Sequence, residues 1–228
     1  MKILCVADHI DPLVYSIHAK ERFADVDLVL GAGDIPMNYL GFIASILNRD
    51  IFFVFGNHDL TCFEMFRNPE QSSIYDFNDH GNTEKKIRNY FGSTYIGDKV
   101  IKARHGLLIA GLGGCIRYNK GTNQYTECQM FFKMLTLVPR LLFNRIFYGR
   151  YLDILLTHSP PYKLNDRSTH THRGFKTFRI FMRLFKPRYL IHGHVHLYDH
   201  NSDRVVHFHE TQIINVDNHF VLEFPYEC

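Results

Sequence analysis

The stretch RYLIHGHVH, residues 188–196, decides the fold class of this chain, because an apolar run ends in three closely spaced histidines. Residues 189–191 have the composition of a buried β-strand. His194 and His196 lie two positions apart, so both side chains project to the same side of an extended segment. In open α/β sheets, ligands bind beyond the carboxyl ends of the strands. The stretch therefore predicts a strand whose end contributes to a binding site.

The same design, an apolar run followed at once by small and polar residues, recurs along the chain. It is found in KILCVADHID (2–11), DLVLGAGDIP (27–36), FFVFGNHDL (52–60), LLIAGLGGCIRYN (107–119) and DILLTHSPP (153–161). Helical patterns lie between some of these runs, at residues 37–50, 124–138 and 174–185. Strands that alternate with helices predict a layered α/β fold with a largely parallel sheet.

Two further regions differ from this design. Residues 204–210, 211–217 and 219–225 have the pattern of short strands joined by tight turns, and we expect them to form a closing antiparallel segment. Residues 62–90 are polar and rich in turn-forming residues, which predicts a long excursion after the third strand.

Composition limits the class of protein. A chain of 228 residues with 46% hydrophobic residues is predicted to form a single domain, 1–228. A net charge of +3 gives no reason to expect specific nucleic-acid binding. Five scattered cysteines without a CxxC pair indicate reduced thiols. With an N-terminal apolar run too short for a signal peptide and no run of ~18 apolar residues, we expect a cytoplasmic protein.

The predicted strand ends gather oxygen and imidazole groups from separate parts of the chain. Two adjacent divalent ions that share a carboxylate need such a set, whereas a single ion needs fewer ligands. The groups concerned are Asp8, Asp34, Asn57, His58, Asp59, His158, His194 and His196.

Five of these motifs occur in an order that resembles the calcineurin-like metallophosphoesterase superfamily. They are AD (7–8), GAGD (31–34), GNHD (56–59), LTHSPP (156–161) and HGHVH (192–196). The resemblance implies a layered β-sandwich flanked by helices, with a metal site at the carboxyl ends of the strands. It also implies a phosphoesterase that cleaves a phosphomonoester, phosphodiester or pyrophosphate in a phosphorylated small molecule.

The resemblance also implies a role for individual residues. Asp34 would bridge two ions, one of them completed by Asn57, His158 and His194 and the other bound by Asp8 and His196. A mixed nitrogen and oxygen ligand set suits Mn²⁺, Fe or Zn²⁺ better than Ca²⁺. A hydroxide shared by the ions would be the nucleophile. His58 resembles the family's catalytic histidine, which protonates the leaving oxygen or stabilises the transition state.

The first motif departs from the family pattern. The superfamily has D-x-H there, but Ile10 stands two residues after Asp8. Either His9, if the loop rotates, or Asp11, if the chain turns before Pro12, could supply the missing ligand. We favour Asp11, because the sequence here resembles a metallophosphoesterase subgroup with D-x-x-D in this place. The ion at this site is expected to bind more weakly than its neighbour.

Substrate contacts are predicted in two loops that follow strand ends on the metal side. These loops, residues 113–127 and 168–178, offer Arg117, Tyr118 and His172. An arginine beside the metals could form paired hydrogen bonds with a phosphate. Two other histidines in and just after residues 188–196 are His192 and His200. We predict that they are ordinary surface or hydrogen-bonded residues.

Two alternative functions remain open. Residues 130–151 are apolar with interspersed basic residues, and such a helix could contact a membrane surface or lipid tails in a lipid-linked pyrophosphatase. We favour two core helices broken near Pro139 for this stretch. The altered first motif also suits a catalytically silent protein-binding scaffold, although a scaffold has no need of the intact His58.

Overall fold

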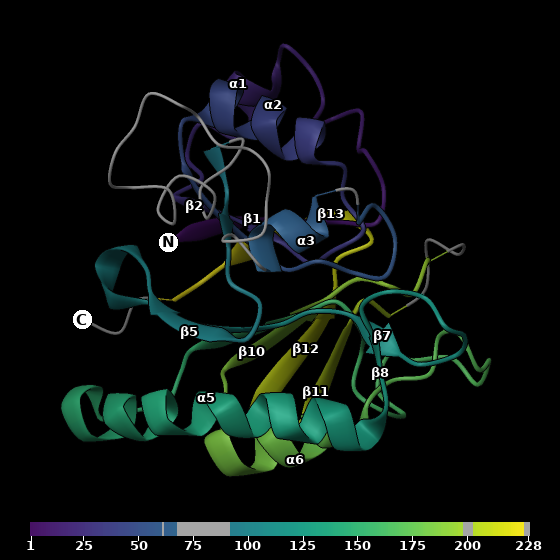
Figure 1. The fold of residues 1–228 in the computed structure, drawn as a ribbon. Coiled ribbons are helices and arrows are strands. Elements are labelled where there is room, and N and C mark those ends of the chain that lie inside the picture. Colours follow the sequence, from purple (N-terminus) through teal and green to yellow (C-terminus); the bar gives the residue numbers. More distant parts are fainter. Residues whose placement is uncertain (61, 68–91, 198–202, 226–228) are drawn as a thin grey trace, which may run out of the picture.

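The computed structural model describes residues 1–60, 62–67, 92–197 and 203–225, which form two β-sheets packed face to face between layers of helices (Figure 1). The first sheet has the strand order β13 (Asn218–Glu223), β1 (Lys2–Ala7), β2 (Leu28–Gly31), β3 (Asp50–Phe53) and β4 (Thr94–Tyr95). The second has the order β11 (Val205–Phe208), β12 (Thr211–Asn215), β10 (Tyr189–His192), β9 (Ile154–Thr157), β6 (Leu108–Leu112) and β5 (Lys99–Lys102). The predicted layered α/β fold is confirmed.

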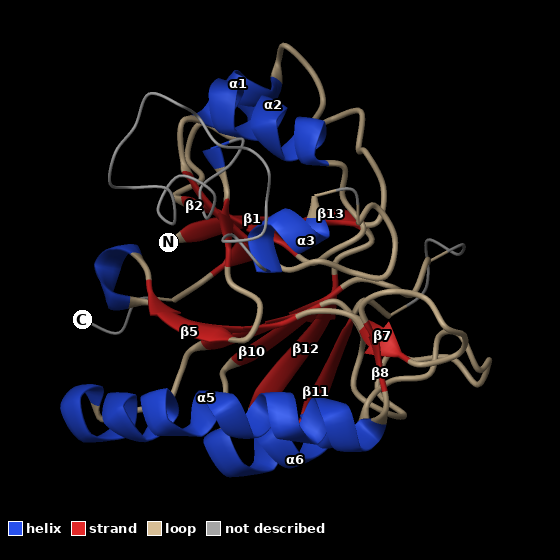
Figure 2. Ribbon diagram, in the orientation of Figure 1, coloured by secondary structure: helices blue, strands red, loops and turns tan. Residues whose placement is uncertain are grey.

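Helices cover the outer face of each sheet (Figure 2). The first sheet carries α1 (Ala19–Arg22), α2 (Met37–Leu47) and α3 (Phe63–Arg67). The second carries α5 (Glu127–Tyr148) and α6 (Lys176–Phe185). A short ribbon of β7 (Cys115–Ile116) and β8 (Gln124–Tyr125) precedes α5, and a 3₁₀ turn, η3 (Arg104–Gly106), joins β5 to β6.

Strands buried on both faces explain the continuous apolar runs of the sequence. In β1, Leu4 and Val6 pack toward the helices, whereas Ile3 and Cys5 pack between the two sheets. This alternation follows from the two-residue period of a strand.

Parallel pairing brings the ends of the predicted strands to one edge of the sandwich. β1, β2 and β3 are mutually parallel neighbours, as are β6, β9, β10 and β12. The loops that follow these strands therefore meet where the two sheets lie together, and they carry the candidate ligands.

The C-terminal strands are only partly the antiparallel segment that the sequence predicts. β11 is antiparallel to β12 and β13 is antiparallel to β1, but β12 pairs in parallel with β10. The chain then crosses from the second sheet to the first between β12 and β13. The carboxyl end of β12 consequently lies at the same edge as the ends of β9 and β10.

The prediction of two helices broken near Pro139 is wrong, because α5 runs without interruption through this residue. Pro139 lies on the exposed side of α5, so the carbonyl of Leu135 that loses its helical partner faces water. The helix begins with a capping box between Thr126 and Gln129 and ends at Gly149 in the left-handed conformation. Within the described part of the chain, no helix is long and apolar enough to cross a membrane.

Two predictions fall partly or wholly outside the described residues. The excursion predicted over residues 62–90 begins with α3, and its remainder, together with His200, is not among the described residues.

Candidate metal centre

Three buried side chains, Asp34, His158 and His194, gather at the carboxyl ends of β2, β9 and β10. Each offers one potential ligand atom, and these atoms lie within 4.8 Å of one another. Nε2 of His158 is 3.3 Å from Oδ2 of Asp34, 3.1 Å from Nδ1 of His194 and 3.2 Å from Oδ1 of Asn57. We call these four residues the first group.

The hydrogen bonds of the two histidines point their free nitrogens at each other. Nδ1 of His158 lies 2.9 Å from the carbonyl oxygen of Ala32, and Nε2 of His194 lies 2.8 Å from that of Thr171. A carbonyl only accepts, so each of these nitrogens carries a hydrogen. The other two, Nε2 of His158 and Nδ1 of His194, then face each other with lone pairs in the neutral rings. A proton on one of them, or a metal ion between them, satisfies both nitrogens, so the donor set fits a metal ion.

A single proton takes that place in the metal-free protein. Burial alone would lower the pKa of His158, but the Asp34 carboxylate outweighs it and raises the pKa to about 9. Burial and the adjacent charge of His158 lower the pKa of His194 to about 3. Burial would raise the pKa of Asp34, yet the charge and hydrogen bond of His158 hold it well below its usual range. A divalent ion would therefore displace one proton on binding.

Glycines make the close approach of these side chains possible. Gly33 has φ +94°, and a Cβ there would stand 2.5 Å from Nδ1 of His158. A Cβ at Gly56 would stand 2.1 Å from Oδ1 of Asp34. Asp34 itself adopts φ 52°. The glycines of GAGD and GNHD thus permit both the turns and the contact between them.

Neighbouring groups orient the first group. Nδ2 of Asn57 donates to the hydroxyl of Tyr118 at 3.2 Å, which leaves Oδ1 of Asn57 directed at His158. The backbone N–H of His58 donates to Oδ1 of Asp34 at 2.7 Å. The side chain of His58 is exposed beside this carboxylate, which places it within reach of a bound molecule.

Asp8 joins the loops after β1 and β10. Both of its carboxylate oxygens accept from the backbone N–H of His194 at 3.0 Å, and a Cβ at Gly193 would stand 2.4 Å from Oδ2 of Asp8. Burial raises the pKa of Asp8 to about 7; His158 opposes the rise, and the charges of Asp34 and Asp217 add to it. Three carboxylates in one partly buried region favour the binding of cations.

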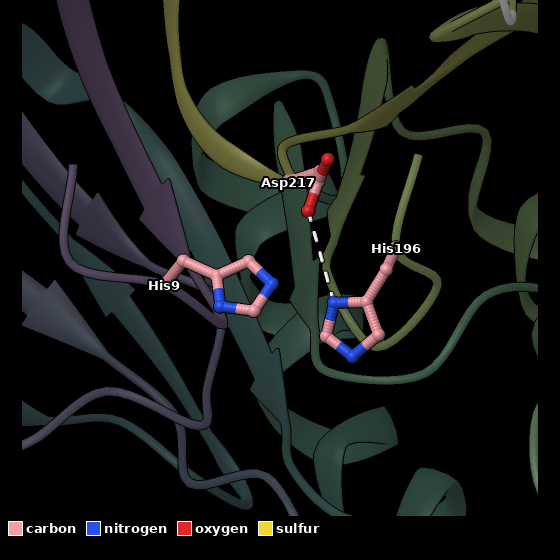
Figure 3. Close-up of side chains that lie close together, drawn as sticks. All are labelled: His9, His196 and Asp217. Carbon is pink, nitrogen blue, oxygen red and sulfur yellow. Dashed lines mark ion pairs between the residues drawn. The ribbon is translucent and has the colours of Figure 1, made fainter. Parts of the chain in front are cut away.

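A second group of potential ligands, His9, His196 and Asp217, lies at the same edge (Figure 3). Their ligand atoms also lie within 4.8 Å of one another. The rings of His9 and His196 have centroids 4.7 Å apart, and Nδ1 of His196 is 3.8 Å from Oδ1 of Asp217. The three residues follow β1, β10 and β12.

The structure does not bring Asp11 to either group, contrary to our expectation for the first motif. Its Oδ2 accepts from Nδ1 of His219, and its Oδ1 accepts from the N–H of Leu13 at 2.8 Å. Its backbone N–H contacts the hydroxyl of Tyr39. The turn that begins at Asp11 directs its carboxylate to β13 instead of to the candidate metal ligands.

The three predicted substrate residues differ in their positions. The ring of His172 lies 5.4 Å from that of His194 and 6.4 Å from that of His196, centroid to centroid. Tyr118 contacts Asn57. Arg117 is instead directed to the start of α5, where it donates to Oε1 of Gln129 at 3.0 Å.

The histidine at the end of β10 behaves as the sequence indicates. His192 is fully buried, and its Nδ1 bonds the carbonyl of Gly193 at 2.8 Å. Burial lowers the pKa of His192 to about 4, so it is neutral.

Asp217 was not among the predicted ligands, although a signal for it exists. It directly follows the apolar run of β12, as Asp8 follows β1. Because residues 211–217 were expected to run antiparallel, their end was not expected beside the other strand ends.

Comparison with known proteins identifies the family of this chain. The profile of the calcineurin-like phosphoesterases matches residues 1–198. The chain belongs to the calcineurin-like phosphoesterase family. No curated protein matches it significantly in sequence.

Solved structures show a similar fold at low sequence identity. One crystal structure is similar with a TM-score of 0.64 and 12% identity, covering 97% of this chain and 94% of the other. The protein TT1561 of Thermus thermophilus is similar with a TM-score of 0.57 and 12% identity, covering 95% of this chain and 89% of the other. At this identity the likeness concerns the fold alone.

Proposed function

We propose that this phosphoesterase cleaves a phosphomonoester, phosphodiester or pyrophosphate bond of a phosphorylated small molecule with two divalent transition-metal ions. The observation that carries the proposal is the pair of imidazole nitrogens, Nε2 of His158 and Nδ1 of His194, which lie 3.1 Å apart beside Asp34. The nitrogen and oxygen ligands suit Mn²⁺, Fe or Zn²⁺.

The first group would hold one ion, and the neighbouring residues Asp8 and His196 would contribute to the other, with Asp34 between them. When bound, the ions would generate a nucleophile from water near neutral pH and neutralise charge on the phosphate oxygens. The chain's own contribution is to fix the ligands, which it does through the carbonyls of Ala32 and Thr171.

His58 is the proposed proton donor to the leaving oxygen. Its backbone N–H is anchored on Asp34, while its side chain is exposed at the mouth of the site. An imidazole so placed can protonate an alkoxide near neutral pH.

Substrate contacts follow from the same geometry. The ring of His172 lies near the rings of His194 and His196, and Tyr118 contacts Asn57, so both border the proposed site. Arg117 would serve only after leaving Gln129 of α5.

We further infer a single domain over 1–228 and a cytoplasmic location. The apolar interior between the two sheets is shared by strands from both ends of the chain, which supports one domain. The free thiols among the described cysteines, Cys5, Cys62, Cys115 and Cys128, support a reducing compartment.

A specific observation favours a second candidate, a lipid-linked pyrophosphatase. α5 exposes large apolar side chains such as Phe132 (67%) and Ile146 (76%), so part of residues 130–151 is available to lipid. A silent scaffold is the third candidate, and turnover separates it from the other two.

The test is hydrolysis of p-nitrophenyl phosphate and bis-p-nitrophenyl phosphate by the full chain with added Mn²⁺. We expect metal-dependent turnover that EDTA abolishes and that Asp34→Asn removes together with bound Mn²⁺. Asp50→Asn is the matched control, because Asp50 lies at the opposite end of the first sheet, where it pairs with exposed Arg104. The proposal is contradicted if the wild type does not bind Mn²⁺. It is also contradicted if the wild type cleaves neither of the two p-nitrophenyl compounds nor a lipid pyrophosphate.

A further inference from the structure

We propose that one of the two ions is held by His9, His196 and Asp217, so that Asp217 replaces the histidine that the family's first motif would place at position 10. This inference rests on the proposed function, because it assigns ligands to the second ion of that centre. Neither Asp217 nor the loop that carries it belongs to the motifs by which the family is recognised.

The three side chains converge from three separate loops (Figure 3). Oδ1 of Asp217 and Nδ1 of His196 are 3.8 Å apart, too far for a hydrogen bond. Two atoms bound to one tetrahedral ion at ~2.1 Å lie ~3.4 Å apart, so a small inward movement seats an ion between them. His9 adds an exposed imidazole from the side of β1.

The Asp217 carboxylate is buried and only half satisfied. Its side chain is 6% exposed. Oδ2 accepts from the N–H of Leu197 at 3.1 Å, whereas Oδ1 has no hydrogen-bond partner in the described structure and is directed toward His196. A buried carboxylate oxygen without a donor is costly, and a bound cation removes that cost.

The loop that carries Asp217 is held by bonds that leave its carboxylate available. Arg204 donates to the backbone carbonyls of Val216, Asp217 and His219, at 3.2, 3.3 and 3.1 Å. Nδ2 of Asn215 donates to the carbonyl of Val195 at 2.8 Å and so ties the end of β12 to the loop of His196. Asp217 is therefore fixed in place by its backbone.

The loop after β1 has the rotation that His9 needs in order to act as a metal ligand. Asp8 adopts φ 61°, and the N–H of His9 bonds the carbonyl of Ala7 at 2.6 Å. The alternation of side-chain directions along β1 stops at this point, so the side chain of His9 turns toward His196. Ile10, at the position of the family histidine, is 44% exposed.

The test is calorimetric titration of the metal-free full chain with Mn²⁺, with the Mn²⁺ paramagnetic resonance spectrum as a second readout. The wild type should bind two ions and show spin coupling between them. Asp217→Asn and His9→Ala should each weaken one site by at least about 10-fold and reduce the coupling, because a ligand contributes at least as much as its supporting groups. Asp11→Asn is the matched control and should leave both sites unchanged.

The outcomes separate this inference from the proposed function. If the wild type binds two coupled ions and both variants do the same with unchanged affinities, the ligand assignment is wrong and the two-ion centre stands. If the wild type binds a single ion, both are wrong. Melting curves of Asp217→Asn and His9→Ala show whether each variant is folded. Because the two changes lie in different loops, one folded variant is enough to test the ligand assignment.

A different observation supports a second proposal: we infer that α5 docks on an anionic lipid surface. The helix buries Met130, Met134, Leu137 and Leu141 against the second sheet, yet its opposite side is also apolar. The apolar stripe on that side is 38–76% exposed and consists of Phe132, Leu135, Leu142, Phe143, Ile146 and Phe147. Proteins seldom expose so many large apolar side chains on one side of a helix without a partner for them.

The charge around the apolar stripe identifies the partner. α5 and α6 together carry six basic residues and one acidic residue, and Asp98 pairs with Lys133 of α5, which leaves a net charge of about +4 over this surface. The acid, Glu127, accepts from the N–H groups of Lys176 and Thr177 at the start of α6. Two copies of this surface would repel each other across a two-fold axis, whereas an anionic membrane complements both the charge and the apolar side chains.

The test is co-sedimentation of the full chain with vesicles of phosphatidylcholine, with and without phosphatidylglycerol. Binding should require phosphatidylglycerol and weaken as salt is raised. Ile146→Ser should lower the affinity by about 10-fold or more, the factor expected for losing one large apolar side chain. Ile17→Ser is the matched control, because Ile17 is 81% exposed but lies outside α5 and α6.

Three results would overturn this proposal. The first is no binding to either vesicle, and the second is equal binding to both. The third is a dimer, measured by light scattering, that Ile146→Ser dissociates, since it would assign the stripe to a second copy of the chain.

Discussion

His158 and His194 each have one ring nitrogen bonded to a backbone carbonyl, and this fixes what the other nitrogen can do. The carbonyls of Ala32 and Thr171 accept from one nitrogen of each ring, so the other two nitrogens, which meet at 3.1 Å, are the ones available to a metal ion. Tyr118 does the same for Asn57 by accepting from its amide. The hydrogen-bond partners of these side chains thus orient them toward a candidate cation site.

His58 differs from these residues, because no described contact joins its side chain to them. We predict that His58→Ala leaves metal binding unchanged and lowers the turnover of an alkyl phosphate by about 10²–10⁴-fold, the usual cost of a lost general acid. The loss should be smaller for p-nitrophenyl phosphate, because p-nitrophenolate departs without a proton. Calorimetry with Mn²⁺ and rates on both esters check this, and unchanged turnover of the alkyl ester would exclude His58 as the proton donor.

Strands and helices were predictable where their pattern is local. β1, β2, β3, β6, β9 and β10 lie where apolar runs end in polar residues, and α2 and α6 lie within the predicted helical ranges. The direction of β12 was not predictable in this way, because it depends on pairing with β10, which is distant in sequence. Since that direction places Asp217 beside His9 and His196, the wrong expectation for β12 led to the omission of Asp217 from the predicted ligands.

Packing between elements also determines two features that a sequence motif alone does not predict, the direction of the Asp11 side chain and the continuity of α5. Asp11 follows Asp8 closely and has a suitable chemical group, but β13 supplies His219 as its partner. The continuity of α5 through Pro139 depends on which side of the helix faces water, and the sheet beneath it fixes that side.

The close contact of Gly33, in the turn after β2, with His158 provides a prediction about stability. Gly33 and Gly149 both have positive φ, but only Gly33 approaches a side chain, whereas nothing lies within 4 Å of a Cβ at Gly149. Gly149→Ala should lower the free energy of unfolding by about 1 kcal/mol through its backbone conformation. Gly33→Ala should cost roughly 2–4 kcal/mol, since the added methyl also displaces His158.

Urea titration measures both free energies, and Mn²⁺ titration supplies the second readout. Gly33→Ala should weaken metal binding while Gly149→Ala leaves it unchanged. Equal losses of stability in the two variants would mean that the contact with His158 contributes nothing.

The candidate ligands come from both sheets of the sandwich. Asp8, Asp34 and Asn57 follow strands of the first sheet, whereas His158 and His194 follow strands of the second. Ions held between them would link the sheets at one edge, in addition to the apolar interior that they share. Because the ligands are separated in the unfolded chain, metal binding is coupled to folding of the whole molecule.

Mn²⁺ should therefore raise the melting temperature of the protein. At a free concentration of 100 times the dissociation constant, one ion adds about 2.7 kcal/mol to the free energy of unfolding. For a chain of this size each kcal/mol raises the midpoint by roughly 2–4 °C, so we expect a rise of roughly 5–11 °C that EDTA reverses. Scanning calorimetry with and without Mn²⁺ measures it. Asp34→Asn should largely abolish the rise, because it removes the carboxylate that we propose to bridge the ions, whereas Asp50→Asn should retain it. A wild-type midpoint that does not move at saturating Mn²⁺ would show that no ion links the two sheets.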